Sequence, residues 1–303
     1  MEETAVAHAW LDQVMTRLVA EAPENRLADF GGQPIFGPPL VGVADGDDPL
    51  FMRFRQVVSP GHILPRELLE QERGLLPTRV RVVAWALPFA DGVRASNRSG
   101  RWPSRLYSLA RNNGGALNHF LRERLVDLLR GEGWAAVAPS LTEGYNAFRS
   151  PEHVFSSTWS ERHVAFAAGL GQFGLNSALI TARGSCVRIG SVVTDLDATP
   201  TPRPYADHRA PCLASGGATC GRCVARCPVK AISAAGMDKT LCYEMRKAVR
   251  AQFMDAYAAQ MHMLPAPVVK SGRRDPGYSL GCALCMCGVP CEDCYPFGAG
   301  MET

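Results

Sequence analysis

The 303-residue chain is long enough for two domains of ordinary size or one large domain. Hydrophobic residues make up 47% and charged residues 20%, as in globular proteins, and a formal net charge of +3 gives no electrostatic case for a nucleic-acid partner. No apolar run reaches the roughly 20 residues that cross a bilayer, and the N-terminus opens with acidic residues rather than the basic region of a signal peptide. We therefore expect a cytoplasmic protein without a membrane partner, whose thiols stay reduced or bind metal.

The first part of the chain predicts helices and strands in alternation. Helices are indicated by apolar residues at i, i+3, i+4 and i+7, strands by short β-branched runs, and turns by glycine and proline. In chain order these patterns predict a helix around residues 11–19, an irregular segment over 30–49, a buried strand over 78–89, a long helix over 106–130 and a short strand over 134–139.

Two further segments complete this pattern. Residues 160–181 predict a helix that ends at glycines, a tight turn and a return into a strand, and residues 185–196 predict another strand. Because strands and helices alternate, the predicted fold class is α/β, with an α+β arrangement left open. The sequence does not fix the order of the strands in the sheet.

The cysteines divide the chain. All eleven lie between Cys186 and Cys294, and none occurs in the first 185 residues. Four prolines over residues 197–211 are typical of a linker or domain edge. We therefore place a boundary near residue 205, between an α/β cofactor or substrate domain over residues 1–205 and a cysteine-rich domain over residues 206–303.

The cysteine-rich half carries the spacing of an iron–sulfur protein. Cys220, Cys223 and Cys227 form C-x2-C-x3-C before Pro228, which is the second part of the bacterial ferredoxin run. In that run, the cysteine before the proline binds a different cluster from its neighbours. The pattern therefore requires more cysteines elsewhere in the chain, and the sequence provides Cys212, Cys242, Cys282, Cys285 and Cys291.

We predict two [4Fe–4S] clusters whose ligands cross between the two ends of this half. One cluster takes Cys212, Cys220, Cys223 and Cys291, and the other takes Cys227, Cys242, Cys282 and Cys285. Cys287 and Cys294 are alternatives to Cys291, and Cys186 is expected to be a small buried apolar residue. A zinc site at the two C-x2-C pairs would leave Cys212 and the C-x3-C-P ending without a role. A disulfide framework fits neither the expected compartment nor the size of the chain.

Five motifs, in order, carry a resemblance to a known family: ERHVAFAAGLGQFGLNSALIT, RIGSVVTDL, CGRCVARCPVKAI, LCYEM and GCALCMCGVPC. Over about residues 77–291 the chain resembles the epoxyqueuosine reductase-like iron–sulfur proteins, which are related to corrinoid-dependent reductive dehalogenases. The resemblance implies a nitroreductase-like α/β domain that binds cobalamin and a ferredoxin-like domain whose two clusters feed it electrons. It also implies an external electron donor of the ferredoxin or flavodoxin type.

The resemblance further implies cofactor contacts ahead of the cysteines. Glycines suit a corrin site because backbone without side chains can approach a flat macrocycle closely. On spacing alone, the same glycines equally predict a helix end with a tight turn. The cofactor-binding set that we predict is Gly169, Gly171, Gly174, Asn176 and Ser177, together with Ser156 and Ser157.

Phe155 marks a departure from the family. Epoxyqueuosine reductases carry an aspartate general acid before a Glu-Arg pair, and alignment on Glu161 and Arg162 puts Phe155 at its place. The serines that follow cannot replace a carboxylic acid as a proton donor of matched pKa, so the catalytic residues stay unassigned. Arg162 is also suited to pair with Glu161 or with another acidic neighbour rather than to bind a ligand. Other polar candidates, all common at structural or solvated positions as well, are Glu143, Tyr145, His153 and His163, and Arg101, Arg105 and Arg111 with Trp102 and Tyr107.

Together these inferences predict an iron–sulfur oxidoreductase that passes electrons through two [4Fe–4S] clusters to a corrinoid or a small organic substrate in the α/β domain. We do not expect tRNA as a partner, because the family's acid is missing and the sequence ends soon after its last cysteine, without the extension of tRNA-acting members. The alternatives are an electron-transfer or corrinoid-activating protein without substrate chemistry of its own, and a protein whose clusters are purely structural.

Overall fold

A computed structural model describes residues 2–74, 77–150, 152, 154–204, 206–215, 220–262 and 280–296. His153, a candidate proton donor, and residue 205, the predicted boundary, lie outside the described residues. No helix in these ranges is both long enough and apolar enough to cross a membrane.

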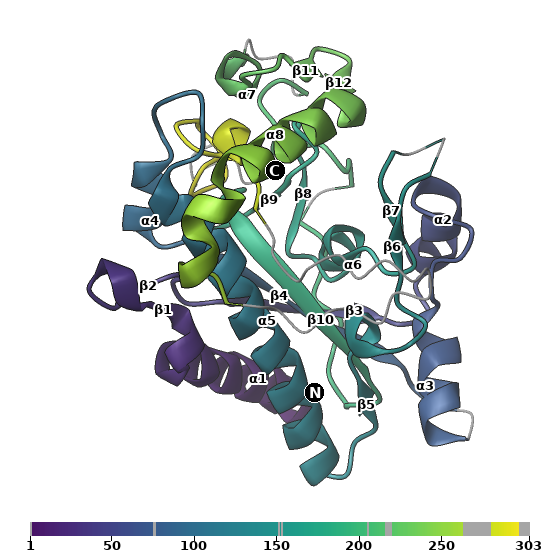
Figure 1. Cartoon of the computed structure of the whole chain (residues 1–303). Helices are drawn as coiled ribbons and strands as arrows, with labels where there is room; N and C mark the ends of the chain where they lie inside the picture. The colour runs from purple at the N-terminus through teal and green to yellow at the C-terminus, as the bar shows by residue number, and fades with distance from the viewer. Residues whose placement is uncertain are drawn as a thin grey trace.

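A four-stranded antiparallel sheet lies at the centre of the first half (Figure 1). Its strand order is β3 (Leu40–Asp45), β4 (Arg81–Pro88), β10 (Val187–Thr194) and β5 (Ala136–Val137). The last three strands lie where the sequence predicts strands. The fourth, β3, corrects the prediction of an irregular segment over residues 30–49. These residues form a strand because β4 supplies their hydrogen-bond partners. The glycines and prolines around them are typical of turns and hide the strand in the sequence pattern.

The side chains of β4 alternate between two apolar cores, as expected for a strand that is covered on both faces. The odd-numbered residues from Val83 to Leu87 face one core with the helices α1 (Glu2–Glu21) and α5 (Arg105–Gly131). The even-numbered residues from Val82 to Ala86 face the other core. That core also contains side chains from α2 (Pro49–Val57), α3 (Pro65–Arg73) and α6 (Glu161–Ala167). The predicted mixed α/β class is thereby confirmed.

The long helix α5 packs closely on β10 because Gly190 has no side chain. A Cβ at this position would lie only 2.5 Å from the Trp85 ring and 2.6 Å from Asn118 Oδ1. Asn118 joins the layers, because its Oδ1 accepts from Trp85 Nε1 at 2.8 Å and its Nδ2 donates to the carbonyl of Ile189 at 2.9 Å. These bonds satisfy polar atoms inside the core and hold α5 against the sheet.

Shorter elements complete the described fold. The helices are α4 (Asp91–Ser96), α7 (Arg222–Arg226) and α8 (Lys239–Tyr257). The two-stranded pairs are β1 (Arg26–Leu27) with β2 (Gln33–Pro34), β6 (Ala147–Phe148) with β7 (Ser156–Ser157), β8 (Gly171–Phe173) with β9 (Leu179–Thr181), and β11 (Ile232–Ser233) with β12 (Gly236–Met237). The 3-10 turns are η1 (Pro23–Asn25), η2 (Ala28–Phe30), η3 (Pro139–Leu141), η4 (Ala258–Gln260) and η5 (Leu284–Met286).

The cysteine-rich half docks on the first half through the segment that begins at residue 280. The hydrogen bonds that hold this segment include Ser185 N to Cys291 O (2.7 Å), Asn97 Nδ2 to Cys282 O (3.2 Å) and Asn176 Nδ2 to Cys285 O (2.9 Å). The helices α7 and α8 lie at the same end of the molecule, at the top of Figure 1. The division into two domains near residue 205 stays a prediction.

Candidate functional site

Four cysteines line one pocket at the junction of the two halves. They are Cys212, Cys220, Cys223 and Cys291, the set predicted for one cluster. The pocket encloses about 360 Å³ of empty volume, part of it open to solvent, and its other walls include Leu175 and Ile180. Cys223 lies in α7, while Cys212 and Cys291 come from loops before and far after it. The structure therefore brings these four thiols together, and their role as ligands stays a prediction.

Two of these sulfurs accept hydrogen bonds from the first half of the chain. The backbone N–H of Leu175 donates to Cys212 Sγ at 3.4 Å, and Ser185 Oγ donates to Cys291 Sγ at 3.7 Å. Burial raises the pKa of Cys291 to about 11, Ser185 opposes this shift, and the thiols of Cys212 and Cys223 add to it. At neutral pH a thiol with so high a pKa keeps its proton unless a metal displaces it. In a bound cluster, the hydrogen bonds that Leu175 and Ser185 donate to sulfur would tune the reduction potential.

The other predicted set forms a second group of thiols beside the first. Cys227 ends α7, Cys242 lies in the first turn of α8, and Cys285 lies in η5, three residues after Cys282. Burial raises the pKa of Cys282 to about 11, and the neighbouring thiols of Cys242 and Cys227 contribute to the rise. The backbone N–H of Ala231 donates to Cys227 Sγ at 3.2 Å. The pKa values of Cys282 and Cys285 are thus both raised in part by Cys242 and Cys227, the other members of the predicted set, and their role as ligands stays a prediction.

The two groups are crossed and adjacent. Cys223 and Cys227 are four residues apart but belong to different groups, because α7 ends at Cys227 in an extended conformation before Pro228. The pKa of Cys285 is raised well above its usual value by burial and by the thiols of its own group, and Cys223 of the first group adds to this. In the described part of the chain, no three His, Cys, Asp or Glu side chains are gathered for a single metal ion. A cubane makes a different demand, since each of its thiolates binds a separate iron.

The three remaining cysteines have distinct positions. Cys186 and Cys287 are completely buried, and their sulfurs are 3.8 Å apart. Cys294 is exposed and its Sγ contacts the carbonyl of Pro290 at 3.8 Å. Of the alternatives that the sequence leaves open, Cys291 is therefore the cysteine that faces the first pocket. The burial of Cys186 is as predicted, but its partner was not foreseen, because no spacing rule joins residues 101 positions apart.

The glycine turn predicted for the corrin serves the chain's own packing. Gly169 has φ +73°, and a Cβ there would lie 2.7 Å from the carbonyl oxygen of Pro202. A Cβ on Gly171 would collide with the carbonyl of Ile180 in the paired strand. Gly174 and Asn176 line the first thiol pocket. At Gly169 and Gly171 the space that a Cβ would take is filled by the chain's own backbone. The packing at these two glycines therefore supports the tight turn, and a corrin contact here stays a prediction.

The predicted serines lie in a second pocket that carries two cations. Ser156 Oγ donates to Val58 O at 2.5 Å, and Ser157 Oγ donates to Trp159 O at 2.9 Å. The pocket is also lined by Phe155, Arg162 and Lys239, and none of its described lining residues is acidic. Burial lowers the pKa of Lys239, and the charge of Arg162 lowers it further. Two cations without a carboxylate suit an anionic ligand.

Phe155 packs against α8 at the edge of this pocket. Its ring meets the Tyr243 ring edge-on with centroids 4.8 Å apart, and the guanidinium of Arg246 lies 5.1 Å from its centroid. His163 is the nearest titratable candidate. Its Nδ1 lies 2.7 Å from Ser160 Oγ, and burial first, then Arg162, lowers its pKa to about 3. The imidazole is therefore neutral at physiological pH.

The Glu-Arg pair is split. Glu161 accepts from Arg122 Nη2 at 2.8 Å and from Ser191 Oγ at 2.6 Å, whereas Arg162 Nη1 donates to the carbonyl of Ser177 at 2.5 Å. Adjacent residues of a helix point in different directions, so the suggested pairing of Arg162 with Glu161 is wrong.

The remaining polar candidates are dispersed. Tyr145 is half-buried, and burial followed by Glu161 raises its pKa. Glu143 is exposed and Arg101 also lies at the surface; they line two further pockets, separate from the thiol pocket and the cationic pocket. The structural contacts of the others are Arg105 over the Phe30 ring (5.3 Å), Trp102 on the Phe253 ring (5.7 Å), Tyr107 in the apolar core and Arg111 against Gly281.

Comparison with known proteins gives structural neighbours only. No protein-family model matches the chain, and none of the curated proteins does. Its structure is similar to epoxyqueuosine reductase from Bacillus subtilis, with 18% identity, a TM-score of 0.41, and coverage of 86% of this chain and 63% of that one. The enzyme from Streptococcus thermophilus has 18% identity and a TM-score of 0.44, with coverage of 84% and 62%. The chain thus spans about three fifths of these structures, which belong to the family that its motifs resemble.

Proposed function

We propose that the chain is an iron–sulfur oxidoreductase with two [4Fe–4S] clusters. The observation that carries this proposal is that Cys212, Cys220, Cys223 and Cys291 line one pocket. The effect of Cys242 and Cys227 on the pKa values of Cys282 and Cys285 supports a second group. One cluster is held by Cys212, Cys220, Cys223 and Cys291, and the other by Cys227, Cys242, Cys282 and Cys285. Such clusters carry single electrons, at potentials set by burial and by hydrogen bonds to sulfur.

The position of the cationic pocket supports a direction for the electrons. Lys239 precedes Cys242 by one helical turn of α8, and the charge of Arg162 lowers the pKa of Cys242 against the dominant effect of burial. The second cluster therefore lies next to this pocket. An external donor of the ferredoxin or flavodoxin type reduces the first cluster, and the second passes electrons to the acceptor.

The acceptor is a small organic molecule with an anionic group, held by Arg162 and Lys239. A corrinoid is the other acceptor that the sequence motifs imply, but the glycine turn gives it no support. Phe155 and neutral His163 leave no carboxylic acid in the described lining of the pocket. The proton therefore comes from the ammonium of Lys239, whose pKa is lowered by burial, from solvent or from the substrate itself.

Iron content tests the clusters. The full chain is reconstituted anaerobically with iron and sulfide, and iron is counted per chain. About eight iron atoms are expected for the native chain and for Cys294→Ser, the matched control in the same loop, and about four for Cys242→Ser. Four iron atoms in the native chain would overturn the crossed assignment.

Titration of the reconstituted chain with cobalamin tests the acceptor. No change in the visible spectrum is expected, whereas a shift to the base-off form would establish the corrinoid. Small carboxylates and phosphates are then screened for binding. Binding that is lost in Lys239→Gln, at unchanged iron content, supports the anionic acceptor.

A second candidate is an electron-transfer or corrinoid-activating protein without substrate chemistry of its own. The absence of a carboxylic acid from the described lining of the cationic pocket favours it. This candidate would be assigned if the reconstituted chain holds eight iron atoms and its clusters are reduced reversibly, but the reduced chain reduces none of the screened acceptors.

A further inference from the structure

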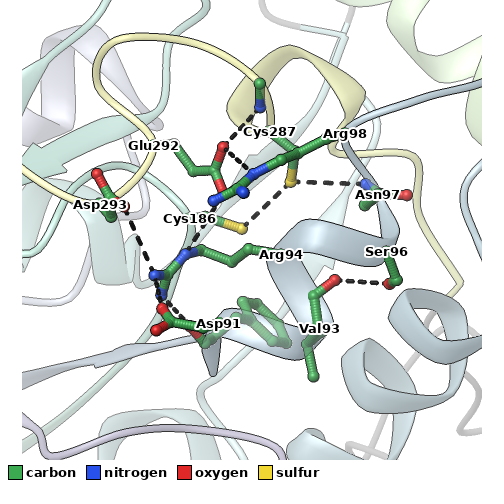
Figure 2. A network of polar contacts seen from close by, with 12 residues as sticks. Asp91, Val93, Arg94, Ser96, Asn97, Arg98, Cys186, Cys287, Glu292 and Asp293 are labelled. Atoms are coloured by element: carbon green, nitrogen blue, oxygen red, sulfur yellow. Dashed lines mark hydrogen bonds and ion pairs between the residues drawn. The ribbon is translucent and has the colours of Figure 1, made fainter.

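Two buried cysteines have no role in the proposed clusters. Cys186 and Cys287 both have 0% exposed surface, and their sulfurs face each other at 3.8 Å (Figure 2). Cys186 immediately precedes β10 of the central sheet, and Cys287 immediately follows η5. We propose that these two cysteines form a reversible dithiol–disulfide pair, which links the cluster-binding loop to the sheet.

The backbone at both positions is held so that the sulfurs stay opposite each other. The carbonyl of Cys186 accepts a hydrogen bond from Phe89 N at 3.0 Å, and the backbone N–H of Cys186 donates to Glu292 O at 3.4 Å. The carbonyl of Cys287 accepts from Arg226 Nε at 3.2 Å, and Asn97 Nδ2 donates to its Sγ at 3.7 Å. An S–S bond is about 2.05 Å long, so the sulfurs need to approach by roughly 1.8 Å. Rotation of the side chains and a small loop shift provide this distance.

Charged residues around the pair fix the loop that carries Cys287. Glu292, only 4% exposed, accepts from Arg98 Nε at 3.0 Å and from Gly288 N at 2.7 Å. Arg94 Nε lies 3.5 Å from the same carboxylate, as Figure 2 shows. The side chains on α4 and the segment after it thereby clamp the loop over Cys186. This clamp reduces the entropy cost of bringing the two sulfurs together.

The position of the pair couples it to the first thiol pocket. Cys287 lies between Cys285 and Cys291, and Cys186 follows Ser185, whose Oγ donates to Cys291 Sγ at 3.7 Å. Closing the disulfide ties the loop that carries three predicted ligands directly to β10. When the disulfide is reduced, only noncovalent contacts, such as the hydrogen bonds and ion pairs of Glu292, hold the loop against the sheet. The proposal concerns the chain itself and holds whether or not clusters are bound.

The oxidant must be small, because neither sulfur is exposed. We assign hydrogen peroxide to this role. One thiol attacks the O–O bond, becomes a sulfenic acid and releases one water; the other thiol then displaces the hydroxyl as a second water and the S–S bond forms. Two thiols and one peroxide give one disulfide and two waters, so the peroxide takes both electrons and the thiols supply both protons. A dithiol reductant reverses the step by thiol–disulfide exchange.

Peptide mapping of the full, anaerobically reconstituted chain tests the pair. One equivalent of hydrogen peroxide is added, free thiols are alkylated under denaturing conditions, and the chain is digested with trypsin. We expect the peptide GSCVR, residues 184–188, linked to the peptide of residues 275–303, with at least a fivefold increase over the untreated sample. Fragmentation of the linked native peptides reads which cysteine is joined, so the result does not depend on how any variant folds.

Variants sharpen the assignment. The link is expected to disappear in Cys186→Ala and Cys287→Ser and to persist in Cys294→Ser, the exposed cysteine of the same loop. Dithiothreitol should restore alkylation of Cys186. A Cys186 that stays alkylated after peroxide, or that is joined to Cys282, Cys285, Cys291 or Cys294 instead, would overturn the proposal.

Discussion

The two halves of the molecule are stabilised in different ways. The first half buries apolar side chains on both faces of a sheet, in two extensive cores. The core around the first thiol pocket is small: its buried members are Leu175, Ile180, Cys212 and Ile232, and the first two belong to the first half. The other apolar side chains that the second half buries, such as Met245 and Val249 of α8, pack into a core of the first half. A region with so small a core of its own is expected to depend for its stability on docking to the first half and on the proposed clusters. Four predictions test this contrast, from the largest expected effect to the smallest.

Removal of iron is expected to open the cysteine-rich half and leave the sheet intact. Metal binding stabilises the region that carries the ligands, here the cysteine-rich half, and adds little to the sheet of the first half. After chelation under reducing conditions, trypsin should cleave after Arg222 and Arg226 at least tenfold faster, while a fragment that contains β4, α5 and β10 persists. Equal protection with and without iron would mean that the second half has a sufficient core of its own.

Trp85→Ala is expected to lower the free energy of unfolding of the sheet by about 3–5 kcal/mol. Trp85 is completely buried, and its Nε1 donates to Asn118 Oδ1, which would lose its partner. Chemical denaturation of the reconstituted chain measures the change. Trp102→Ala, at a side chain that is 43% exposed, is the matched control and should cost less than about 1 kcal/mol. A similar loss in both variants would contradict the two-core description.

Glu292→Gln tests the docking between the halves. The substitution removes a buried carboxylate that faces Arg98 and Arg94, and should destabilise the protein by about 2 kcal/mol. Asp293→Asn, half-exposed and 3.7 Å from Arg94, is the control and should cost less than about 1 kcal/mol. Denaturation of the two variants side by side gives the comparison. If Glu292→Gln behaves like the control, the clamp does not hold the loop.

The last expected effect, a loss of about 2 kcal/mol between pH 6.5 and 5, is a pH dependence that arises in the first half. Burial lowers the pKa of His62 to about 4. The unfolded chain takes up this proton near pH 6.5, so stability is complete above pH 6.5 and falls by about 1.4 kcal/mol per unit as the pH drops toward 4. Denaturation midpoints between pH 7 and 5 measure the slope. It should be smaller in His62→Gln and unchanged in His208→Gln, a histidine side chain that is 59% exposed; an unchanged slope in both would rule out His62 as its source.

Local patterns predicted the elements that carry a strong period of their own. The long helix α5, the buried strand β4 and the turn around Gly169 and Gly171 follow from apolar spacing and from glycine. The edge strand β3 does not, because its hydrogen bonds come from β4, Gly42 interrupts its apolar run, and two prolines come directly before it.

The sequence by itself determined the α/β class and the concentration of thiols in the second half. It also predicted two groups of four cysteines, because short spacings constrain which residues one loop can bring together. Only the tertiary structure decided that Cys291 rather than Cys287 faces the first pocket, that Cys287 meets Cys186, and that Glu161 pairs with Arg122. These contacts join residues 39 to 101 positions apart. Their geometry depends on how the sheet, α5 and the cysteine-rich loop pack, and no local period encodes that packing.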